Sequence, residues 1–330
     1  MIDQYNRDIN YLRVSVTDRC NLRCMYCMPK EGLSGIGHDD ILRYEEIHRI
    51  IGIAAGEGIT KIRITGGEPL VRRGLTEFIA SLRTMPELTD VSLTTNGILL
   101  ETYAEQLFEA GIRRINISLD SLNAEKYAKI TRGGDIRAVL QGIRKVRETG
   151  FSPIKINIVA IKGFNEDEVL DFARLTLDNP YQIRFIELMA LGRAGIENNG
   201  RYLANSVIRE QIGKLGTLQA VNGGGTKNDG PARIYRLAGG AGEIGFISPM
   251  SRHFCHSCNR LRLTADGQLR ACLLSDDEVD LKGPLRRGGG NKEIRELIRE
   301  TIARKPREHQ ESCDESHIKK CMKEMPAIGG

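Results

Sequence analysis

The sequence has 330 residues, 40% of them hydrophobic and 28% charged, which is enough apolar material for one large folded domain or two smaller ones. Its 48 basic and 43 acidic residues leave a formal net charge of +5, a mild excess that is compatible with an anionic ligand but identifies no partner. No stretch approaches the roughly 18 apolar residues of a membrane span, and the N-terminus lacks the apolar core of a signal peptide. We therefore expect a cytoplasmic protein with no membrane contact, whose eight cysteines are metal ligands or free thiols rather than disulfides.

The first half of the chain alternates short β-rich runs with stretches of helical periodicity. Strands are expected at 11–16, 61–65, 90–95, 114–120, 154–160 and 182–188, and helices between them at 43–58, 102–111 and 138–150. Six strand-then-helix units predict a parallel sheet with right-handed crossovers. Polar motifs follow the carboxyl ends of the first four strands, which favours an incomplete TIM-type (β/α)6 barrel over an open doubly wound sheet.

After about residue 195 the pattern changes to loops rich in glycine and asparagine, at 194–202 and 222–232, and short strands. Strand-like runs lie at 233–238 and 243–248, and a hairpin over 261–274 is predicted by the Asp266–Gly267 pair. A last helix is expected at 291–305. The predicted domains are a partial barrel over 1–195, a β-rich C-terminal region over 196–305 that carries a second metal group, and a tail over 306–330.

The first group of cysteines is Cys20, Cys24 and Cys27, in the pattern C-x3-C-x2-C on one loop after a strand. A 4Fe-4S cube has four irons, so three thiolates leave one iron open to bind another molecule. The alternatives are a zinc site completed by a distant histidine, with His38 the nearest, or three unrelated thiols. The tight spacing favours an iron–sulfur cluster.

The second group is Cys255, Cys258 and Cys272, in the pattern C-x2-C-x13-C. Spacing alone does not decide between a second iron–sulfur cluster and a Cys3His zinc site, because His253 and His256 are available as a fourth ligand. Because this group also stops at three cysteines, as the first group does, we favour a second iron–sulfur cluster. Arg260 and Arg262 alternate along the strand after Cys258 and place positive charge beside that metal, although an ordinary solvated strand face would carry the same pattern.

Several motifs together carry a resemblance to a known family: "RCNLRCMYCMP", "TGGEPLVRR", "TTNG", "INISLDS", "CHSCNRLRLTADGQLRACL" and the closing Gly329–Gly330. From about residue 5 to its end the chain resembles the GTP 3′,8-cyclase family of radical S-adenosylmethionine enzymes. The first motif alone would indicate only the radical S-adenosylmethionine superfamily. The family's enzymes are lyases that convert GTP to (8S)-3′,8-cyclo-7,8-dihydroguanosine 5′-triphosphate, the first step of molybdenum cofactor biosynthesis.

The resemblance implies two 4Fe-4S clusters and a bound S-adenosylmethionine. The first cysteine group would hold the cluster that binds and reductively cleaves S-adenosylmethionine, and the second group would hold a cluster whose open iron takes the guanine edge. The implied S-adenosylmethionine contacts are Tyr26, Gly66, Gly67, Glu68, Ser118 and Met189. Without the resemblance, the two glycines are read as a tight turn after a strand and Ser118 as a helix-capping hydroxyl.

The sequence contains no G-x-x-x-x-G-K-[ST] phosphate loop, and "GGGTKNDG" does not satisfy that pattern. Positive charge for a triphosphate must then come from strand side chains that alternate with apolar neighbours: Arg13, Lys61, Arg63, Lys155 and Arg184. An inward-facing cation in a barrel is costly unless an anion meets it, although salt bridges or solvent-facing strands are alternatives. In the family, matching positions contact GTP, as does the position of Thr94, and Arg260 and Arg262 also meet the substrate.

The implied mechanism is hydrogen abstraction from C3′ of the GTP ribose, followed by attack of the carbon radical on C8 of guanine. An electron then returns, assisted by Arg260 or Arg262 and the second cluster. In the family, Gly329 and Gly330 thread back toward the active site, whereas a frayed end is the ordinary expectation for a chain terminus. Cys313 and Cys321 match neither group and are expected to be free thiols.

The resemblance implies further partners: an electron donor such as flavodoxin or ferredoxin, and a downstream cyclic pyranopterin monophosphate synthase. A homodimer is left open. One alternative function is another radical S-adenosylmethionine enzyme, such as a peptide modifier. A second is a zinc protein that binds RNA or DNA through the arginine-rich hairpin, but only 5% aromatic residues and no tryptophan count against it, so no nucleic-acid partner is expected.

Overall fold

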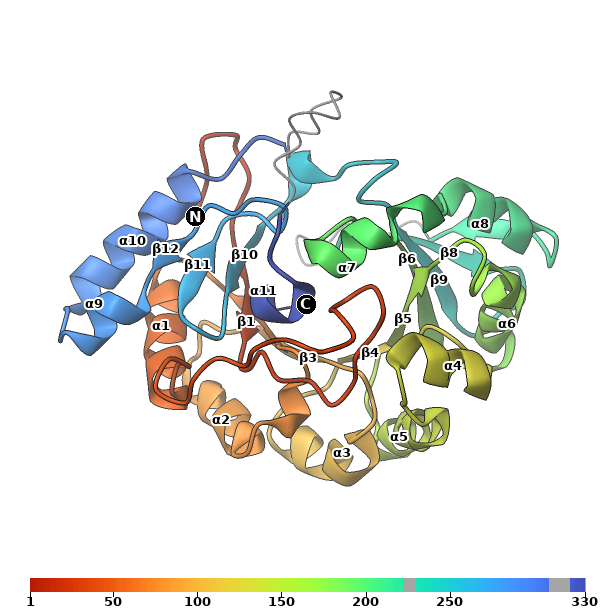
Figure 1. The fold of residues 1–330 in the computed structure, drawn as a ribbon, viewed down its shortest axis with the longest axis horizontal. Coiled ribbons are helices and arrows are strands. Elements are labelled where there is room, and N and C mark those ends of the chain that lie inside the picture. The colour runs from red at the N-terminus through yellow and green to blue at the C-terminus, as the bar shows by residue number, and fades with distance from the viewer. Residues whose placement is uncertain (222–229, 309–320, 330) are drawn as a thin grey trace.

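The computed structural model describes residues 1–221, 230–308 and 321–329, and these form one twelve-stranded sheet covered by helices. The strand order is β12-β11-β10-β1-β2-β3-β4-β5-β6-β9-β8-β7. In Figure 1 the strands form a crescent with α1 to α6 along its outer side. The strands are β1 Tyr11–Ser15, β2 Lys61–Thr65, β3 Asp90–Thr95, β4 Ile115–Ser118, β5 Ile154–Ala160, β6 Tyr181–Glu187, β7 Leu218–Ala220, β8 Arg233–Leu237, β9 Glu243–Ile247, β10 Arg260–Leu263, β11 Gln268–Arg270 and β12 Val279–Asp280.

The six central strands, β1 to β6, run parallel in chain order, as the sequence predicts. Helices that connect them cover the outside of the sheet: α1 Tyr44–Gly56, α2 Leu75–Ser81, α3 Leu100–Glu109, α4 Ala124–Thr131, α5 Ile136–Thr149 and α6 Val169–Asp178. Later helices are α7 Gly192–Glu197, α8 Asn205–Gly213, α9 Lys282–Arg286, α10 Asn291–Ala303 and α11 Met325–Ile328.

Local sequence explains the bounds of α5, one of the connecting helices. Asp135 caps its N-terminus by accepting a hydrogen bond from the backbone N–H of Arg137. Its buried face carries Val139, Ile143 and Val146 at helical spacing. The helix ends at Gly150, whose φ of +97° is a left-handed conformation that glycine adopts without strain.

The C-terminal region joins the same sheet at both of its edges, which the sequence did not predict. β9 pairs in parallel with β6, and β10 pairs in parallel with β1. The expected hairpin is confirmed: β10 and β11 pair antiparallel around Gly267, which has a φ of +86°. The division at residue 195 stays a prediction, because strands on both sides of it belong to one sheet.

The fold is therefore an α/β partial barrel whose strand order is linear and whose two end strands are β12 and β7. Figure 1 shows α11 inside the crescent, between β10 and α7. The carboxyl ends of the parallel strands and the loops that follow them face this central space, which is where barrels of this class place their reactive groups. None of the helices in the described part of the chain has both the length and the apolarity to cross a bilayer.

Candidate active site

A cavity of about 360 Å³ is lined by strand side chains and by the loops after the strands' carboxyl ends. It collects almost every residue that the sequence singled out. Both cysteine groups line it: Cys20, Cys24 and Cys27, and Cys255, Cys258 and Cys272. The other lining residues from the sequence predictions are Arg13, Tyr26, Lys61, Arg63, Gly66, Gly67, Glu68, Thr94, Ser118, Lys155, Arg184, Met189, Arg260 and Arg262.

The loop after β1 carries the first cysteine group and is held against α4 by backbone hydrogen bonds. The N–H of Arg23 donates to the carbonyl of Thr131 at 3.0 Å, and that of Met25 donates to Ile130 at 2.9 Å. Within the loop, the N–H of Cys27 donates to the carbonyl of Cys24 at 2.9 Å, which closes a tight turn between two of the thiols. The cysteine loop therefore has a hydrogen-bonded turn of its own and is attached to α4.

Burial raises the pKa of all three thiols in this group, and the charges of neighbouring thiols raise the pKa of Cys24 and Cys27 further. Burial raises the pKa of Cys24 well above its usual value, and the charge of Cys27 raises it further. Burial and the charge of Cys20 act in the same direction on Cys27. Three thiolates in this place are therefore unfavourable unless a cationic group binds all of them. The irons of an iron–sulfur cluster would supply that positive charge.

A single metal ion does not fit either group as well as a cluster does. Among the residues that the structure describes, no three His, Cys, Asp or Glu side chains lie close enough together to hold one ion. A cluster tolerates wider spacing, because each thiolate binds a different iron. His38, the nearest candidate for a zinc ligand, is fully exposed and contacts Asp39.

Asp120 is a site residue that sequence reasoning missed, although it lies in the "INISLDS" motif quoted above. It follows β4, and its carboxylate accepts hydrogen bonds from the Tyr26 hydroxyl at 2.7 Å and from the N–H of Val159 at 2.8 Å. Burial raises the pKa of Asp120 to about 6, against the opposing effect of these bonds. Asp120 therefore ties the cysteine loop, through Tyr26, to β5.

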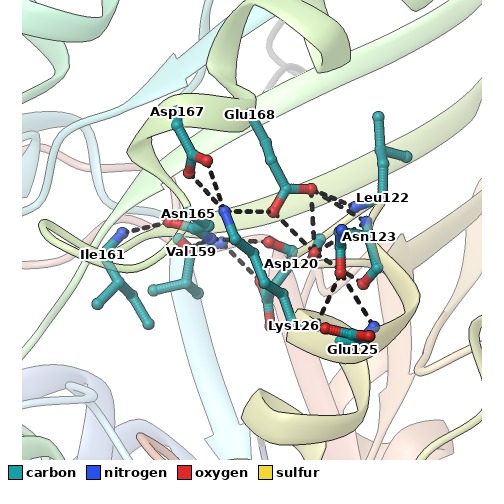
Figure 2. Close-up of polar contacts among 11 residues, drawn as sticks. Asp120, Leu122, Asn123, Glu125, Lys126, Val159, Ile161, Asn165, Asp167 and Glu168 are labelled. Atoms are coloured by element: carbon teal, nitrogen blue, oxygen red, sulfur yellow. Dashed lines mark hydrogen bonds and ion pairs between the residues drawn. The ribbon is translucent and has the colours of Figure 1, made fainter.

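A network of hydrogen bonds around Asn165 and Glu168 holds the backbone at Asp120 in place, as Figure 2 shows. The Asn165 amide donates to the carbonyls of Asp120 and Val159, at 2.7 and 2.9 Å, and its oxygen accepts from the N–H of Ile161 at 2.8 Å. Beside it, the buried carboxylate of Glu168 accepts from the N–H of Leu122 at 2.6 Å. The turn between β4 and α4 is thus hydrogen-bonded on both sides, which makes the position of Asp120 well determined.

Close backbone packing requires glycine at positions 66 and 67. A Cβ on Gly66 would lie 2.6 Å from the carbonyl oxygen of Thr17, and one on Gly67 would lie 2.4 Å from that of Arg19. The start of the cysteine loop passes directly over these glycines, so any side chain there would displace it. Both glycines are therefore explained by this close packing, and their contact with S-adenosylmethionine stays a prediction.

Glu68 is buried and joins the ends of β2 and β3. Its carboxylate accepts hydrogen bonds from the Thr95 hydroxyl at 2.7 Å and from the N–H of Asn96 at 2.6 Å. Burial raises its pKa to about 7, and the hydrogen bonds oppose that shift. The Asn96 amide in turn lies 3.8 Å from the sulfur of Cys20. Glu68 thus positions the segment beside the first cysteine.

Basic residues form rows across neighbouring strands. Arg262, Arg13 and Arg63 are cross-strand partners on β10, β1 and β2. Arg260 and Lys61 hold the next row, on either side of Tyr11. Like charges directly opposite each other destabilise a sheet, so an anion that lies against these rows would stabilise the arrangement.

The charges in these rows act on one another strongly. Burial lowers the pKa of Arg13 well below its usual value, and the charge of Arg262 lowers it further. Burial and the charge of Arg260 lower the pKa of Arg262 to about 10. On the other side of the cavity, burial and the charge of Arg184 lower the pKa of Lys155 to about 7. A polyanion in the cavity would reverse these shifts.

Some buried polar atoms in the cavity wall lack a hydrogen-bond partner among the described residues. They include the hydroxyl oxygen of Thr94 and the side-chain oxygen of Asn157. Such atoms are uncommon in native proteins and point to a missing ligand or water. Thr94 was predicted from the sequence, whereas Asn157 was not, because an asparagine in a strand gives no distinctive signal.

The second cysteine group lies on the opposite side of the cavity, at the hairpin of β10 and β11 and the turn before it. Burial raises the pKa of Cys258, but the charges of Arg260 and Lys305 and hydrogen bonds from Arg260 outweigh it, and the pKa falls to about 6. The basic surroundings of Cys258 thus favour its thiolate form, which is the form that binds a metal. The nearby His253 and His256 are exposed.

The C-terminal tail returns to the cavity as the resemblance implies. The carbonyl of Gly329 accepts hydrogen bonds from the Thr65 hydroxyl at 3.1 Å and from the Arg262 guanidinium at 3.3 Å. A Cβ on Gly329 would lie 2.6 Å from that of Ser15, and its φ is +83°, so glycine is needed on two grounds. Gly330 lies outside the described residues.

The remaining cysteines belong to neither group. Cys321 is buried, and its sulfur accepts a hydrogen bond from Arg270 at 3.3 Å. Cys313 lies outside the described residues, as does most of the "GGGTKNDG" segment.

Two family models match this sequence. The model of the Radical SAM superfamily matches residues 14–176, and the model Molybdenum Cofactor Synthesis C matches residues 181–311. The first covers the strands and loops around the first cysteine group, and the second covers the whole of the second group.

Curated relatives match nearly the whole chain. A GTP 3′,8-cyclase of Pelotomaculum thermopropionicum is 52% identical over 94% of this chain and 95% of its own length. One from Moorella thermoacetica is 50% identical over the same shares, and one from Alkaliphilus oremlandii is 46% identical over the full length of both chains.

Solved structures with a similar fold are more distant in sequence. SuiB of Streptococcus suis, bound to its precursor peptide SuiA, superposes with a TM-score of 0.58 at 12% identity, over 83% of this chain. A second SuiB structure, bound to S-adenosylmethionine, has a TM-score of 0.55 at 13% identity. This chain spans 63% and 62% of the two SuiB chains, and the likeness establishes the fold alone.

Proposed function

This chain belongs to the family of the GTP 3′,8-cyclases, and on that premise we propose that it cyclises GTP to (8S)-3′,8-cyclo-7,8-dihydroguanosine 5′-triphosphate, the first step of molybdenum cofactor biosynthesis. As a radical S-adenosylmethionine enzyme it uses S-adenosylmethionine and an iron–sulfur cluster. We further propose that Cys255, Cys258 and Cys272 hold a second 4Fe-4S cluster. When bound, these groups supply one-electron reduction and a carbon radical.

The observation that carries this proposal is the shared cavity. Two groups of three thiols line one space, and the rows of basic side chains also line it. A triphosphate matches the basic rows in charge, since each cation there lies beside other cations. A nucleoside triphosphate of this kind can therefore lie with its ribose toward the first cysteine group and its base toward the second.

The residues of the chain then have distinct tasks. Tyr26, Gly66, Gly67, Glu68, Ser118 and Met189 shape the S-adenosylmethionine site, and Arg13, Lys61, Arg63, Thr94, Lys155 and Arg184 bind GTP. Arg260, Arg262 and the Gly329–Gly330 tail lie against the base and the developing product. Holding the two reactants in one geometry is the main contribution of the protein, since it removes the entropy cost of a bimolecular step.

The proposal includes partners that consume the product and supply electrons. We propose that a cyclic pyranopterin monophosphate synthase takes up the cyclised nucleotide, and that flavodoxin or ferredoxin reduces the clusters. A cytoplasmic location is part of the proposal. It is supported by the seven cysteines in the described part of the chain, none of which forms a disulfide, as is usual in a reducing compartment.

The test is anaerobic incubation of the iron-loaded enzyme with dithionite, S-adenosylmethionine and each of GTP, ATP, CTP and UTP separately. We expect 5′-deoxyadenosine and a cyclised nucleotide with GTP, because the guanine edge is bound on the side of the second cysteine group. ATP is the matched control, since it has the same triphosphate and ribose. Equal turnover of ATP and GTP would refute the assignment of the base to the second group.

A further inference from the structure

A buried lysine joins the two backbone segments that lie next to two of the cysteines in the second group. Lys305 follows α10 and is 2% exposed. Its ammonium donates hydrogen bonds to the carbonyl of Arg260 at 2.8 Å and to that of Ala271 at 2.5 Å. Arg260 lies two residues after Cys258, and Ala271 lies directly before Cys272. One side chain thus fixes the hairpin at both of these ligand positions.

A buried arginine holds the third cysteine to the same segment. The Arg7 guanidinium donates to the carbonyl of Cys255 at 2.9 Å, and also to those of Pro306 at 2.8 Å and Arg307 at 3.1 Å. Its Nε donates to the Asp3 carboxylate at 2.6 Å, and both side chains are almost fully buried. The backbone at all three cysteines is therefore tied to residues 305–307 by two buried cations.

The two cations differ in how their charge is balanced. Arg7 forms an ion pair with Asp3. Burial lowers the pKa of the Lys305 ammonium, and the charges of Cys258 and Cys272 oppose that shift. The charges of Arg7 and Arg260 lower the pKa further. A buried ammonium is costly without an anion. Thiolates of the second group are the anions that its surroundings offer.

We propose that Arg7 and Lys305 are positioning residues for the second iron–sulfur cluster, and that Lys305 also stabilises the reduced form of that cluster with its charge. This inference rests on the proposed function, which places a second cluster on Cys255, Cys258 and Cys272. A cluster on three thiolates gains one negative charge on reduction, so a buried cation beside it raises the reduction potential. Arg7, which is neutralised by Asp3, holds the backbone and has a smaller effect on the potential.

The experiment isolates the second cluster in the full-length chain by changing Cys20, Cys24 and Cys27 to alanine. In this background we compare Lys305→Met with Arg304→Gln. The second variant removes one positive charge at the adjacent residue, whose side chain is half exposed. Each protein is loaded with iron and sulfide anaerobically, and three quantities are measured: bound iron, its rate of loss to a chelator, and the reduction potential by a titration followed by electron paramagnetic resonance.

We expect about four irons per chain in the background and in Arg304→Gln. Lys305→Met should lose iron roughly tenfold faster, which is typical for the loss of a group that supports metal ligands, and its cluster should have a more negative potential. Lys305→Arg keeps the charge and should return the potential toward that of the background. A purely structural role for Lys305 would change iron loss without this charge-dependent shift.

The possible failures are distinguishable. If the background binds no iron while the unaltered enzyme binds about four, the second cluster of the proposed function is wrong. If the background binds about four irons and Lys305→Met matches Arg304→Gln in potential and iron loss, the present inference is overturned. If Lys305→Met holds no cluster, Lys305→Arg decides: retention of the cluster supports the inference, and loss in both variants overturns it.

Discussion

The hydroxyl of Thr94 is buried in the cavity wall and has no hydrogen-bond partner within the described chain. A buried polar group of this kind costs the folded protein about 1–3 kcal/mol. We predict that Thr94→Val raises the melting temperature of the ligand-free protein but weakens GTP binding by roughly five- to tenfold, the worth of one hydrogen bond. Differential scanning calorimetry and isothermal titration calorimetry measure the two effects. Lower stability together with unchanged affinity would remove Thr94 from the GTP site.

We predict that Lys155 makes GTP binding depend on pH. Burial and the charge of Arg184 lower its pKa to about 7, and a bound phosphate favours the ammonium and raises that pKa again. Above pH 7 the complex therefore holds more protons than the free protein, so affinity falls as pH rises, by at most about tenfold per pH unit. We predict this fall between pH 7 and 9 relative to Lys155→Arg, whose charge is fixed.

The comparison with Lys155→Arg cancels the ionisation of the nucleotide itself, because both proteins bind the same GTP. Isothermal titration calorimetry at pH 6, 7, 8 and 9 gives the ratio of the two affinities. A ratio that stays constant over this range would show that Lys155 does not meet the phosphates.

At the scale of single residues, the sequence predicts those whose chemistry is distinctive and misses those whose role depends on a neighbour. The cysteine groups and the alternating cations are visible in the pattern. Asp120 matters because Tyr26 faces it, and Lys305 matters because two strand carbonyls converge on its ammonium. Both contacts join residues far apart in the chain, so no local pattern contains them.

Among the elements, the tail with α11 is held by contacts that lie outside the cavity. Lys323 donates to Glu278 at 2.8 and 2.6 Å, and Glu278 also pairs with the buried Arg270 of β11. The N–H of Arg193 donates to the Glu324 carboxylate at 2.9 Å. The tail is therefore anchored to the hairpin of the second cysteine group and to α7 before it reaches Gly329.

We predict that Lys323→Met loosens this tail. The Lys323 side chain is 41% exposed, so its ion pair contributes no more than about 1 kcal/mol, and amide exchange over 321–329 should rise up to roughly fivefold. Lys145→Met, which breaks an ion pair between α5 and Glu105, is the control. Hydrogen–deuterium exchange with mass spectrometry measures both. Unchanged exchange over 321–329 in Lys323→Met would mean that other contacts alone hold the tail.

The elements of the first half were predictable because their periodicity is strong and local. The strands at 61–65, 90–95 and 154–160 agree with β2, β3 and β5 to the residue. The parallel pairing of β9 with β6 and of β10 with β1 was not predictable. Both pairings join strands that are far apart in sequence, and strand periodicity does not specify a partner.

For the whole molecule, the pairing of β10 with β1 is what brings the two cysteine groups to one cavity. The first group follows β1, and the second surrounds β10. We predict about eight irons and eight sulfides per chain after anaerobic loading, and about four in a variant with Cys255, Cys258 and Cys272 changed to alanine. Near-stoichiometric zinc with no visible chromophore would contradict this prediction.

The central claim is that this cavity holds S-adenosylmethionine and GTP together, with C3′ of the ribose next to the first cysteine group. The most direct measurement uses GTP that carries deuterium at C3′, in a single anaerobic turnover with dithionite and S-adenosylmethionine. We predict that one deuterium appears in 5′-deoxyadenosine, detected by mass spectrometry, and that GTP deuterated at C8 transfers none. Unlabelled 5′-deoxyadenosine from the C3′-deuterated substrate, formed together with the cyclised product, would contradict the account.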